Sequence, residues 1–121
     1  MDKKILIVDD AMFMRSIIRK ILKEAGYTQV WEAQDGEKAM ELFREVSPDL
    51  VLLDITMPGR SGLEVLEEML GLVPNVRVIM CSAVGQEMMI QKALTIGASD
   101  FIVKPFKADE FSRIVNRCLE Q

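Results

Sequence analysis

The strongest constraint on this chain is a fivefold alternation between short apolar runs and longer stretches whose apolar residues recur at helical spacing. The short runs span residues 5–8, 30–33, 50–53, 76–80 and 101–103. Runs that stay apolar on both alternating faces are typical of strands buried on both sides in a parallel sheet. The run that contains Glu32 is less apolar, so we expect it to lie at an edge of the sheet.

Between these runs the apolar residues follow the helical period. The helical stretches span residues 14–25, 39–46, 63–73, 90–94 and 111–119. Four of them are followed by residues that cap or stop helices, namely Gly26, Pro48, Pro74 and Gly97. The repeated order of strand and helix predicts an α/β fold, a (βα)₅ doubly wound five-stranded parallel sheet.

Length and charge limit the organisation and the class of the protein. The 121 residues suit one domain with its own hydrophobic core, so we expect a single domain over residues 1–121 with no output domain. The net charge of −4 argues against direct binding to nucleic acid. Because histidine is absent, Ser-His-Asp and Cys-His relays and zinc sites with imidazole ligands are excluded.

The two cysteines and the N-terminal residues indicate the compartment. Cys81 and Cys118 are too far apart in sequence for a CxxC pair, and we expect both to be reduced, mostly buried thiols. The apolar run before Asp9 is too short for a signal peptide or a membrane span. The sequence therefore predicts a cytoplasmic protein with no membrane partner.

Polar residues follow the apolar runs at the ends where function is expected. Asp9 and Asp10 follow the first run, Asp54 the third, Ser82 the fourth and Lys104 the fifth. Ligands of open α/β sheets bind outside the carboxyl ends of the strands, so these side chains should lie together. Singly, each has a simpler explanation, since Asp and Ser after a strand often cap the next helix. Their coincidence at four strand ends favours a site.

The expected cluster suits phosphoryl transfer. Three ionised carboxylates repel one another unless cations intervene, and Lys104 supplies only one positive charge. An all-oxygen ligand set favours Mg²⁺, with Mn²⁺ as an alternative ion. Ser82 and Lys104 can donate to phosphoryl oxygens, and a carboxylate can itself accept the phosphoryl group. Asp54 is the best candidate for the acceptor, which leaves Asp9 and Asp10 for the metal.

Several motifs in fixed order carry a family resemblance. They are IVDD at 7–10, Met14-Arg15, DGEKAM at 35–40, PDLVLLDITMP at 48–58, Gly62, Ser82-Ala83 and GASDFIVKPF at 97–106. From about residue 4 to its end, the chain resembles response-regulator receiver domains, above all the single-domain receivers of chemotaxis. The resemblance implies a flavodoxin-like sheet with strand order 2-1-3-4-5.

The resemblance also implies roles for the site residues. Asp54 would take a phosphoryl group from a phosphohistidine of a sensor kinase. Asp9, Asp10, Asp54 and the backbone carbonyl of Thr56 would hold Mg²⁺. Lys104 would pair with the phosphoryl group, and its peptide bond to Pro105 would be cis.

A switch would carry the signal to a binding face. Ser82 would move toward the phosphoryl group, and the ring of Phe101 would then turn inward. Phe101 stands where much of the chemotaxis branch has Tyr, so a contact through that hydroxyl is lost. The face formed by the fourth helix, fifth strand and fifth helix would bind the next protein in the pathway.

The resemblance implies protein partners for a monomer. They are a histidine sensor kinase (CheA-like), the flagellar motor switch protein and an aspartyl-phosphate phosphatase. The protein would not be an enzyme apart from catalysing its own phosphorylation and dephosphorylation.

Three other functions share part of this pattern. A flavin binder of the same winding needs a phosphate-cradling first loop, which Asp9 and Asp10 would repel. A phosphatase of the haloacid dehalogenase type needs a second Asp where Thr56 stands. A stand-alone receiver that serves as a phosphorelay intermediate or phosphate sink outside chemotaxis remains open as an alternative.

Overall fold

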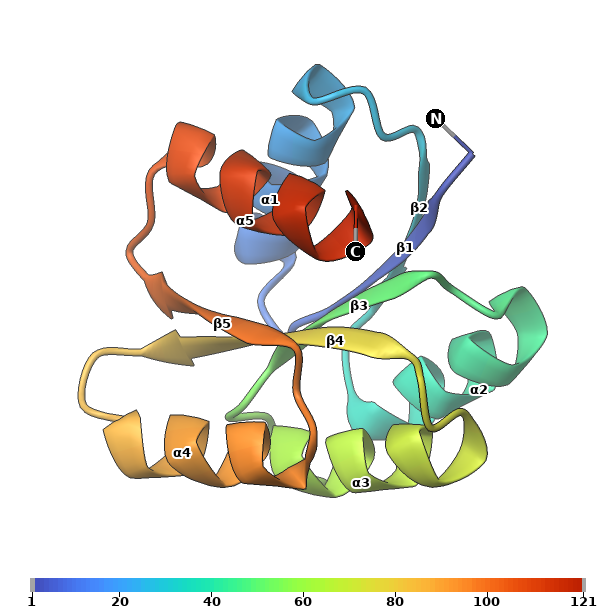
Figure 1. Ribbon diagram of the computed structural model, residues 1–121, viewed down its shortest axis with the longest axis vertical. Helices are drawn as coiled ribbons and strands as arrows, with labels where there is room; N and C mark the ends of the chain where they lie inside the picture. Colours follow the sequence, from blue (N-terminus) through green and yellow to red (C-terminus); the bar gives the residue numbers. More distant parts are fainter. Residues whose placement is uncertain (1, 121) are drawn as a thin grey trace.

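One parallel sheet with helices on both faces makes up residues 2–120, the part of the chain that the computed structural model describes (Figure 1). In chain order the elements are β1 (Lys4–Val8), α1 (Met12–Glu24), β2 (Gln29–Ala33), α2 (Gly36–Val46), β3 (Leu50–Asp54), α3 (Gly62–Leu72), β4 (Arg77–Ala83), α4 (Glu87–Ile96), β5 (Asp100–Lys104) and α5 (Ala108–Glu120). This confirms the predicted alternation of strand and helix.

The strand order is β2-β1-β3-β4-β5, and every pairing is parallel, as predicted. β2 lies at an edge and most of its residues are only half-buried, which agrees with Glu32 in its sequence. The register pairs Val8 of β1 with Leu53 of β3 and Asp54 with Cys81 of β4. The carboxyl ends of the three central strands therefore meet at one edge of the sheet.

Alternating side chains of the strands form two hydrophobic layers. Leu6 and Leu53 point toward α2, α3 and α4, where Phe43, Leu66 and Ala93 belong to the same buried cluster. Ile7 and Leu52 point to the opposite face and pack with residues of α1 and α5. Both faces of the central strands are thus removed from water, which explains their continuous apolar runs.

Most helices end where the sequence predicts. Gly26 and Gly97 have φ values of 99° and 137°, which glycine adopts without strain, just beyond α1 and α4. Leu94, an apolar residue of the helical stretch 90–94, is nevertheless 38% exposed and lines a pocket together with Phe101. The strand β4 also continues to Ala83, so Ser82 lies inside this strand rather than after it.

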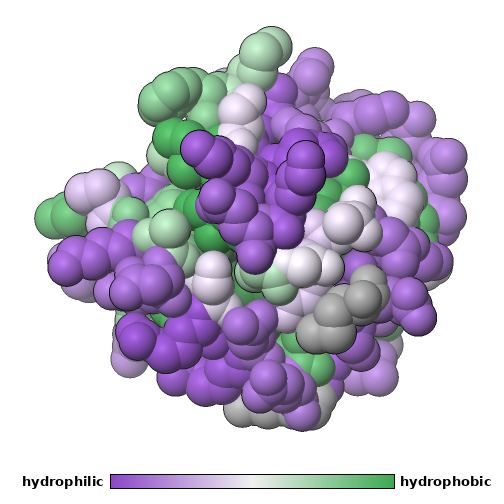
Figure 2. All heavy atoms as spheres, turned by 90° about the horizontal axis from the view of Figure 1, so that it is seen from above, coloured by the Kyte–Doolittle hydropathy of each residue, from purple (hydrophilic) through white to green (hydrophobic). Residues whose placement is uncertain are grey.

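The outer surface is largely polar on the side of α1 and α5. Figure 2 shows that this side is mainly hydrophilic, with smaller hydrophobic areas between the polar groups. Within residues 2–120 no helix has both the length and the apolar character that a bilayer crossing requires. Cys81 and Cys118 are both buried free thiols, as predicted from the sequence.

Candidate functional site

Three carboxylates meet at the carboxyl edge of the sheet. Asp9 and Asp10 follow β1, and Asp54 is the last residue of β3. One carboxylate oxygen from each of the three lies within 4.8 Å of the others. Asp9 and Asp54 are buried, whereas Asp10 is exposed, so the cluster opens to solvent on one side. The structure therefore brings together the three acidic residues predicted from the sequence.

Lys104 brings a positive charge into this acidic cluster from the end of β5. Its Nζ atom lies 2.9 Å from Oδ2 of Asp9 and 3.3 Å from Oδ2 of Asp54. The Lys104–Pro105 peptide bond is cis, as the resemblance to receiver domains implies. The ammonium group thus contacts both buried carboxylates, whereas the exposed carboxylate of Asp10 forms no ion pair within residues 2–120.

Backbone groups and one arginine hold the two buried aspartates in place. The backbone N–H of Ala11 donates to Oδ1 of Asp9 over 2.9 Å, and that of Thr56 donates to Oδ1 of Asp54 over 3.2 Å. The buried Arg15 donates to the backbone carbonyl of Asp9 over 2.6 Å. Ala11 itself occupies the N-cap position of α1, with no side-chain hydrogen bond. Helix capping therefore does not explain the aspartates after β1.

Burial and charge act in opposite directions on the titrating groups. Burial raises the pKa of Asp54 above its usual range, and Asp9 adds to this, although Lys104 and the Thr56 N–H act against it. Burial alone would lower the pKa of Lys104, but its hydrogen bond to Asp9 and the two nearby carboxylates raise it. Lys104 is therefore held as an ammonium ion, and further positive charge would stabilise the ionised form of the carboxylates beside it.

The donor set fits a hard divalent cation. The cluster of Asp9, Asp10 and Asp54 offers only oxygen ligands, with neither imidazole nor thiolate within the described cluster. Such ligands suit Mg²⁺ or Mn²⁺ better than Zn²⁺, and a site with one exposed ligand leaves coordination positions for water or a phosphoryl oxygen. The residues present are thus compatible with the metal expected from the sequence.

The two predicted switch residues lie on neighbouring strands, Ser82 near the carboxyl end of β4 and Phe101 near the start of β5. The hydroxyl of Ser82 is buried and has no hydrogen-bond partner within residues 2–120. A buried hydroxyl without a hydrogen-bond partner lowers the stability of the fold. Phe101 is 37% exposed and lines a pocket of 290 Å³ together with Ile90 and Leu94 of α4. The ring therefore borders an open pocket against α4.

Comparison with known proteins agrees with this geometry. Residues 5–116 match the response regulator receiver domain. The chain is a receiver domain of two-component response regulators.

Receiver domains of several organisms are similar to it over nearly their whole length. The chemotaxis protein CheY of Bacillus subtilis is 49% identical over 119 residues, which cover 98% of this chain and 99% of the relative. Sporulation initiation phosphotransferase F of the same organism is 39% identical, with 98% and 95% covered. The crystal structure of the NtrX receiver domain from Brucella abortus superposes with a TM-score of 0.93 at 36% identity, with 98% and 99% covered.

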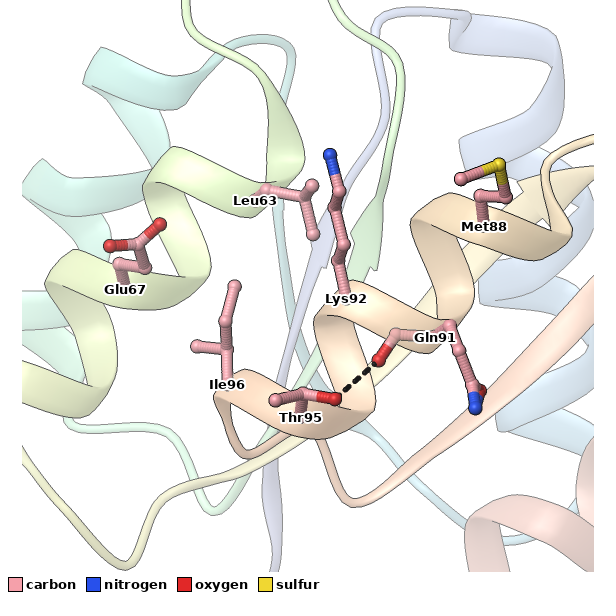
Figure 3. A pocket seen from close by; sticks show the side chains of 7 residues that line it. All are labelled: Leu63, Glu67, Met88, Gln91, Lys92, Thr95 and Ile96. Carbon is pink, nitrogen blue, oxygen red and sulfur yellow. Dashed lines mark hydrogen bonds between the residues drawn. The ribbon is translucent and has the colours of Figure 1, made fainter.

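A large pocket of this receiver domain lies away from the acidic cluster. It measures 580 Å³ and lies between α3 and α4, where Leu63 and Ile96 point toward each other (Figure 3). Its rim carries Glu67 and Lys92, and Thr95 donates a hydrogen bond of 2.9 Å to the carbonyl of Gln91. None of the predicted site residues lines this pocket.

Gln86 is a site neighbour that the sequence does not reveal. Its side chain joins the loop after β4 to Thr56 in the loop after β3. A glutamine at a helix start has no motif or periodicity that marks it. Its position follows only from the loop conformation, whereas Arg15 at least belongs to a family motif.

Proposed function

We propose that this receiver domain accepts a phosphoryl group on Asp54 from the phosphohistidine of a sensor kinase and thereby switches a protein-binding face. One observation carries the proposal. Asp54 is a buried residue, 8% exposed, and its carboxylate lies beside two further carboxylates and the Lys104 ammonium group. A nucleophilic carboxylate, an oxygen-ligand cluster and a cation within one site are the parts that phosphoryl transfer to an aspartate requires.

The chain's own residues position and neutralise the reacting group. An oxygen of Asp54 forms a bond to phosphorus while the phosphorus–nitrogen bond breaks, and the electron pair of that bond leaves with the imidazole. The Thr56 N–H holds the other carboxylate oxygen and so orients the nucleophile. Lys104 then shares its charge with the phosphoryl oxygens, which lowers the cost of bringing a second anion to the site.

Asp9, Asp10, Asp54 and the backbone carbonyl of Thr56 would hold Mg²⁺. When bound, the ion supplies the positive charge that Lys104 alone does not provide for three carboxylates and a phosphoryl group. The support for this set is the mutual distance of 4.8 Å or less among the three carboxylates.

Ser82 and Phe101 would transmit the modification. The Ser82 hydroxyl lacks a partner in the described residues, and a phosphoryl oxygen on Asp54 would supply one. Displacement of the Ser82 side chain toward Asp54 would open space for the Phe101 ring, which lines a pocket at α4. The face formed by α4, β5 and α5 would then change its affinity for a partner protein.

The flagellar motor switch protein is the partner that we propose for this face, because several similar proteins are named CheY chemotaxis proteins. The kinase would be of the chemotaxis type, an aspartyl-phosphate phosphatase would terminate the signal, and the protein would act in the cytoplasm. The protein would catalyse only its own phosphorylation and dephosphorylation.

A binding measurement tests the chemotaxis assignment. Beryllofluoride should tighten the binding of this protein to a motor-switch peptide, and an unchanged affinity would contradict the assignment.

A mass measurement tests the receiver chemistry itself. Incubation with acetyl phosphate and Mg²⁺ should add one phosphoryl group to the wild-type protein and none to Asp54→Ala. Asp49→Ala serves as the control, since Asp49 lies before β3 and its carboxylate accepts from the Lys4 backbone N–H, away from the cluster. Equal labelling of Asp54→Ala would overturn the proposal.

A phosphorelay intermediate is the second candidate. The similarity to sporulation initiation phosphotransferase F over 98% of this chain supports it. A relay intermediate should pass its phosphoryl group to a histidine phosphotransfer protein faster than it loses the group to water. Loss to water alone would argue against this candidate.

A further inference from the structure

The side-chain amide of Gln86 bridges the two loops that border the acidic cluster. Its Oε1 atom accepts a hydrogen bond of 2.8 Å from the backbone N–H of Ala83, at the end of β4. Its Nε2 atom donates a hydrogen bond of 2.5 Å to Oγ1 of Thr56, in the loop after β3. Gln86 stands at the N-cap position of α4, but its side chain makes no capping hydrogen bond. Its amide is thus committed to the bridge.

Both ends of the bridge adjoin residues of the proposed site. Ala83 directly follows Ser82, whose hydroxyl is buried and unpaired within the described residues. Thr56 donates its backbone N–H to Oδ1 of Asp54. A displacement of Ser82 toward Asp54 moves the neighbouring peptide of Ala83. The two hydrogen bonds of Gln86 must then lengthen or break, or the Gln86 side chain must move with the peptide.

Little else holds the loop between β4 and α4. Val84 is 75% exposed, and Gly85 has a φ of 96° with open space where a Cβ atom would stand. Because the loop itself contributes few packing contacts, two hydrogen bonds from Gln86 are a large share of what fixes its position.

We propose that Gln86 is a positioning residue that holds the β4–α4 loop in its resting place through Thr56 and so sets the affinity of the site for a phosphoryl group. This inference rests on the proposed function. In the resting protein the bridge fixes the backbone N–H of Ala83, next to the Ser82 residue whose hydroxyl is unpaired within the described residues. Occupancy of Asp54 gives Ser82 a partner, and the loop then leaves the position that the bridge favours.

Beryllofluoride with Mg²⁺ is the probe for this inference, because it occupies a phosphoaspartate site without chemistry. Gln86→Met keeps the length of the side chain but removes both hydrogen bonds, so it should bind beryllofluoride about three- to tenfold more tightly. This range corresponds to about 0.7–1.4 kcal/mol, the scale of one hydrogen bond. Gln91→Met makes the same chemical change five residues further along the chain, at an exposed residue of α4 outside the bridge, and should change the affinity less than twofold.

A double-mutant cycle separates the bridge from a general effect on the loop. Thr56→Val removes the hydroxyl that receives the Gln86 hydrogen bond at nearly constant size. In the Thr56→Val protein, Gln86→Met should change the beryllofluoride affinity less than twofold, because the bridge is already broken. In a Thr56→Ser protein, which keeps the hydroxyl, Gln86→Met should again tighten the binding of beryllofluoride at least threefold. Hydrogen exchange of the Ala83 amide should accelerate in Gln86→Met and stay unchanged in Gln91→Met.

The outcomes are distinguishable. Unchanged or weaker beryllofluoride binding by Gln86→Met, with normal binding by the wild type, overturns the role of Gln86 alone. If Gln86→Met changes the beryllofluoride affinity equally in the wild-type and Thr56→Val backgrounds, Gln86 does not act through its hydrogen bond to Thr56. Failure of the wild-type protein to bind beryllofluoride overturns the proposed function and this inference together.

Discussion

The ammonium group of Lys104 lies 3.3 Å from a carboxylate oxygen of Asp54, although 50 residues separate the two in sequence. They end β5 and β3, which are separated in the sheet by β4, so the lysine side chain reaches across the end of a strand. One cation thereby faces a site with three acidic groups. The electrostatic balance of this site leads to the first two predictions.

Replacement of Asp54 by Asn should stabilise the metal-free protein. Burial raises the pKa of the Asp54 carboxyl, so its ionised form is less favourable in the folded protein than in the unfolded chain. Removal of the charge should raise the free energy of unfolding at pH 7 by about 1 kcal/mol, a usual size for the effect of a single substitution. Urea unfolding in EDTA measures this change.

Asp109→Asn is the matched control, because Asp109 is an exposed residue at the start of α5. It should change the free energy of unfolding by less than about 0.5 kcal/mol. Equal or lower stability of Asp54→Asn than of the wild type would contradict the charge balance described above.

Magnesium should stabilise the wild-type protein specifically. At a concentration of about ten times its dissociation constant, Mg²⁺ should raise the free energy of unfolding by about 1.4 kcal/mol. Asp10→Asn should lose most of this gain, because it removes the exposed carboxylate of the cluster. The measurement compares urea unfolding in MgCl₂ and in NaCl of equal ionic strength. Full stabilisation of Asp10→Asn would exclude Asp10 from the metal site.

The fold and the acidic cluster could be predicted because both follow from the periodic spacing of apolar residues in the sequence. Apolar runs identify the strands, parallel strands align their carboxyl ends, and Asp9, Asp10 and Asp54 follow those ends directly. Glu32 likewise marks β2 as the edge strand because a charged side chain is costly inside a covered sheet.

Details of the loops and helix faces could not be predicted in this way. The exposure of Leu94 depends on how α4 is rotated against β5, and its helical spacing fits a buried and an exposed face equally well. The Gln86–Thr56 hydrogen bond depends on two loop conformations at once. Neither loop has a repeating pattern that fixes its backbone, so the sequence contains no local signal for this contact.

A tryptophan at position 101 should report the proposed switch. Phe101 is 37% exposed beside a 290 Å³ pocket, so inward rotation would transfer the ring from water to an apolar environment. In a Trp31→Phe background, the emission of Phe101→Trp should shift to shorter wavelength on addition of beryllofluoride and Mg²⁺. The native Trp31 lies on the edge strand β2 and should shift little. An unshifted emission from position 101 would contradict rotation of this ring.

Two glycines of α3 should respond in opposite directions to replacement by alanine. A Cβ atom at Gly62 would lie 2.2 Å from the backbone oxygen of Asp54 and 2.8 Å from Cα of Ile55. Gly62→Ala should therefore lower the free energy of unfolding by more than about 3 kcal/mol, because backbone has to move. At Gly71 the Cβ atom meets open space, so Gly71→Ala should raise it by up to about 1 kcal/mol. Equal stabilities of the two variants would contradict the close approach of α3 to β3.

Identification of the modified residue tests the central claim most directly. The protein is incubated with acetyl phosphate and Mg²⁺ and reduced with borohydride, which converts an aspartyl phosphate to homoserine, and its peptides are mapped by mass spectrometry. We predict homoserine at position 54 and unmodified aspartate at positions 9 and 10. Homoserine at either of those two positions, or none at position 54 while a known receiver is modified in parallel, would contradict the assignment of Asp54 as the phosphoacceptor.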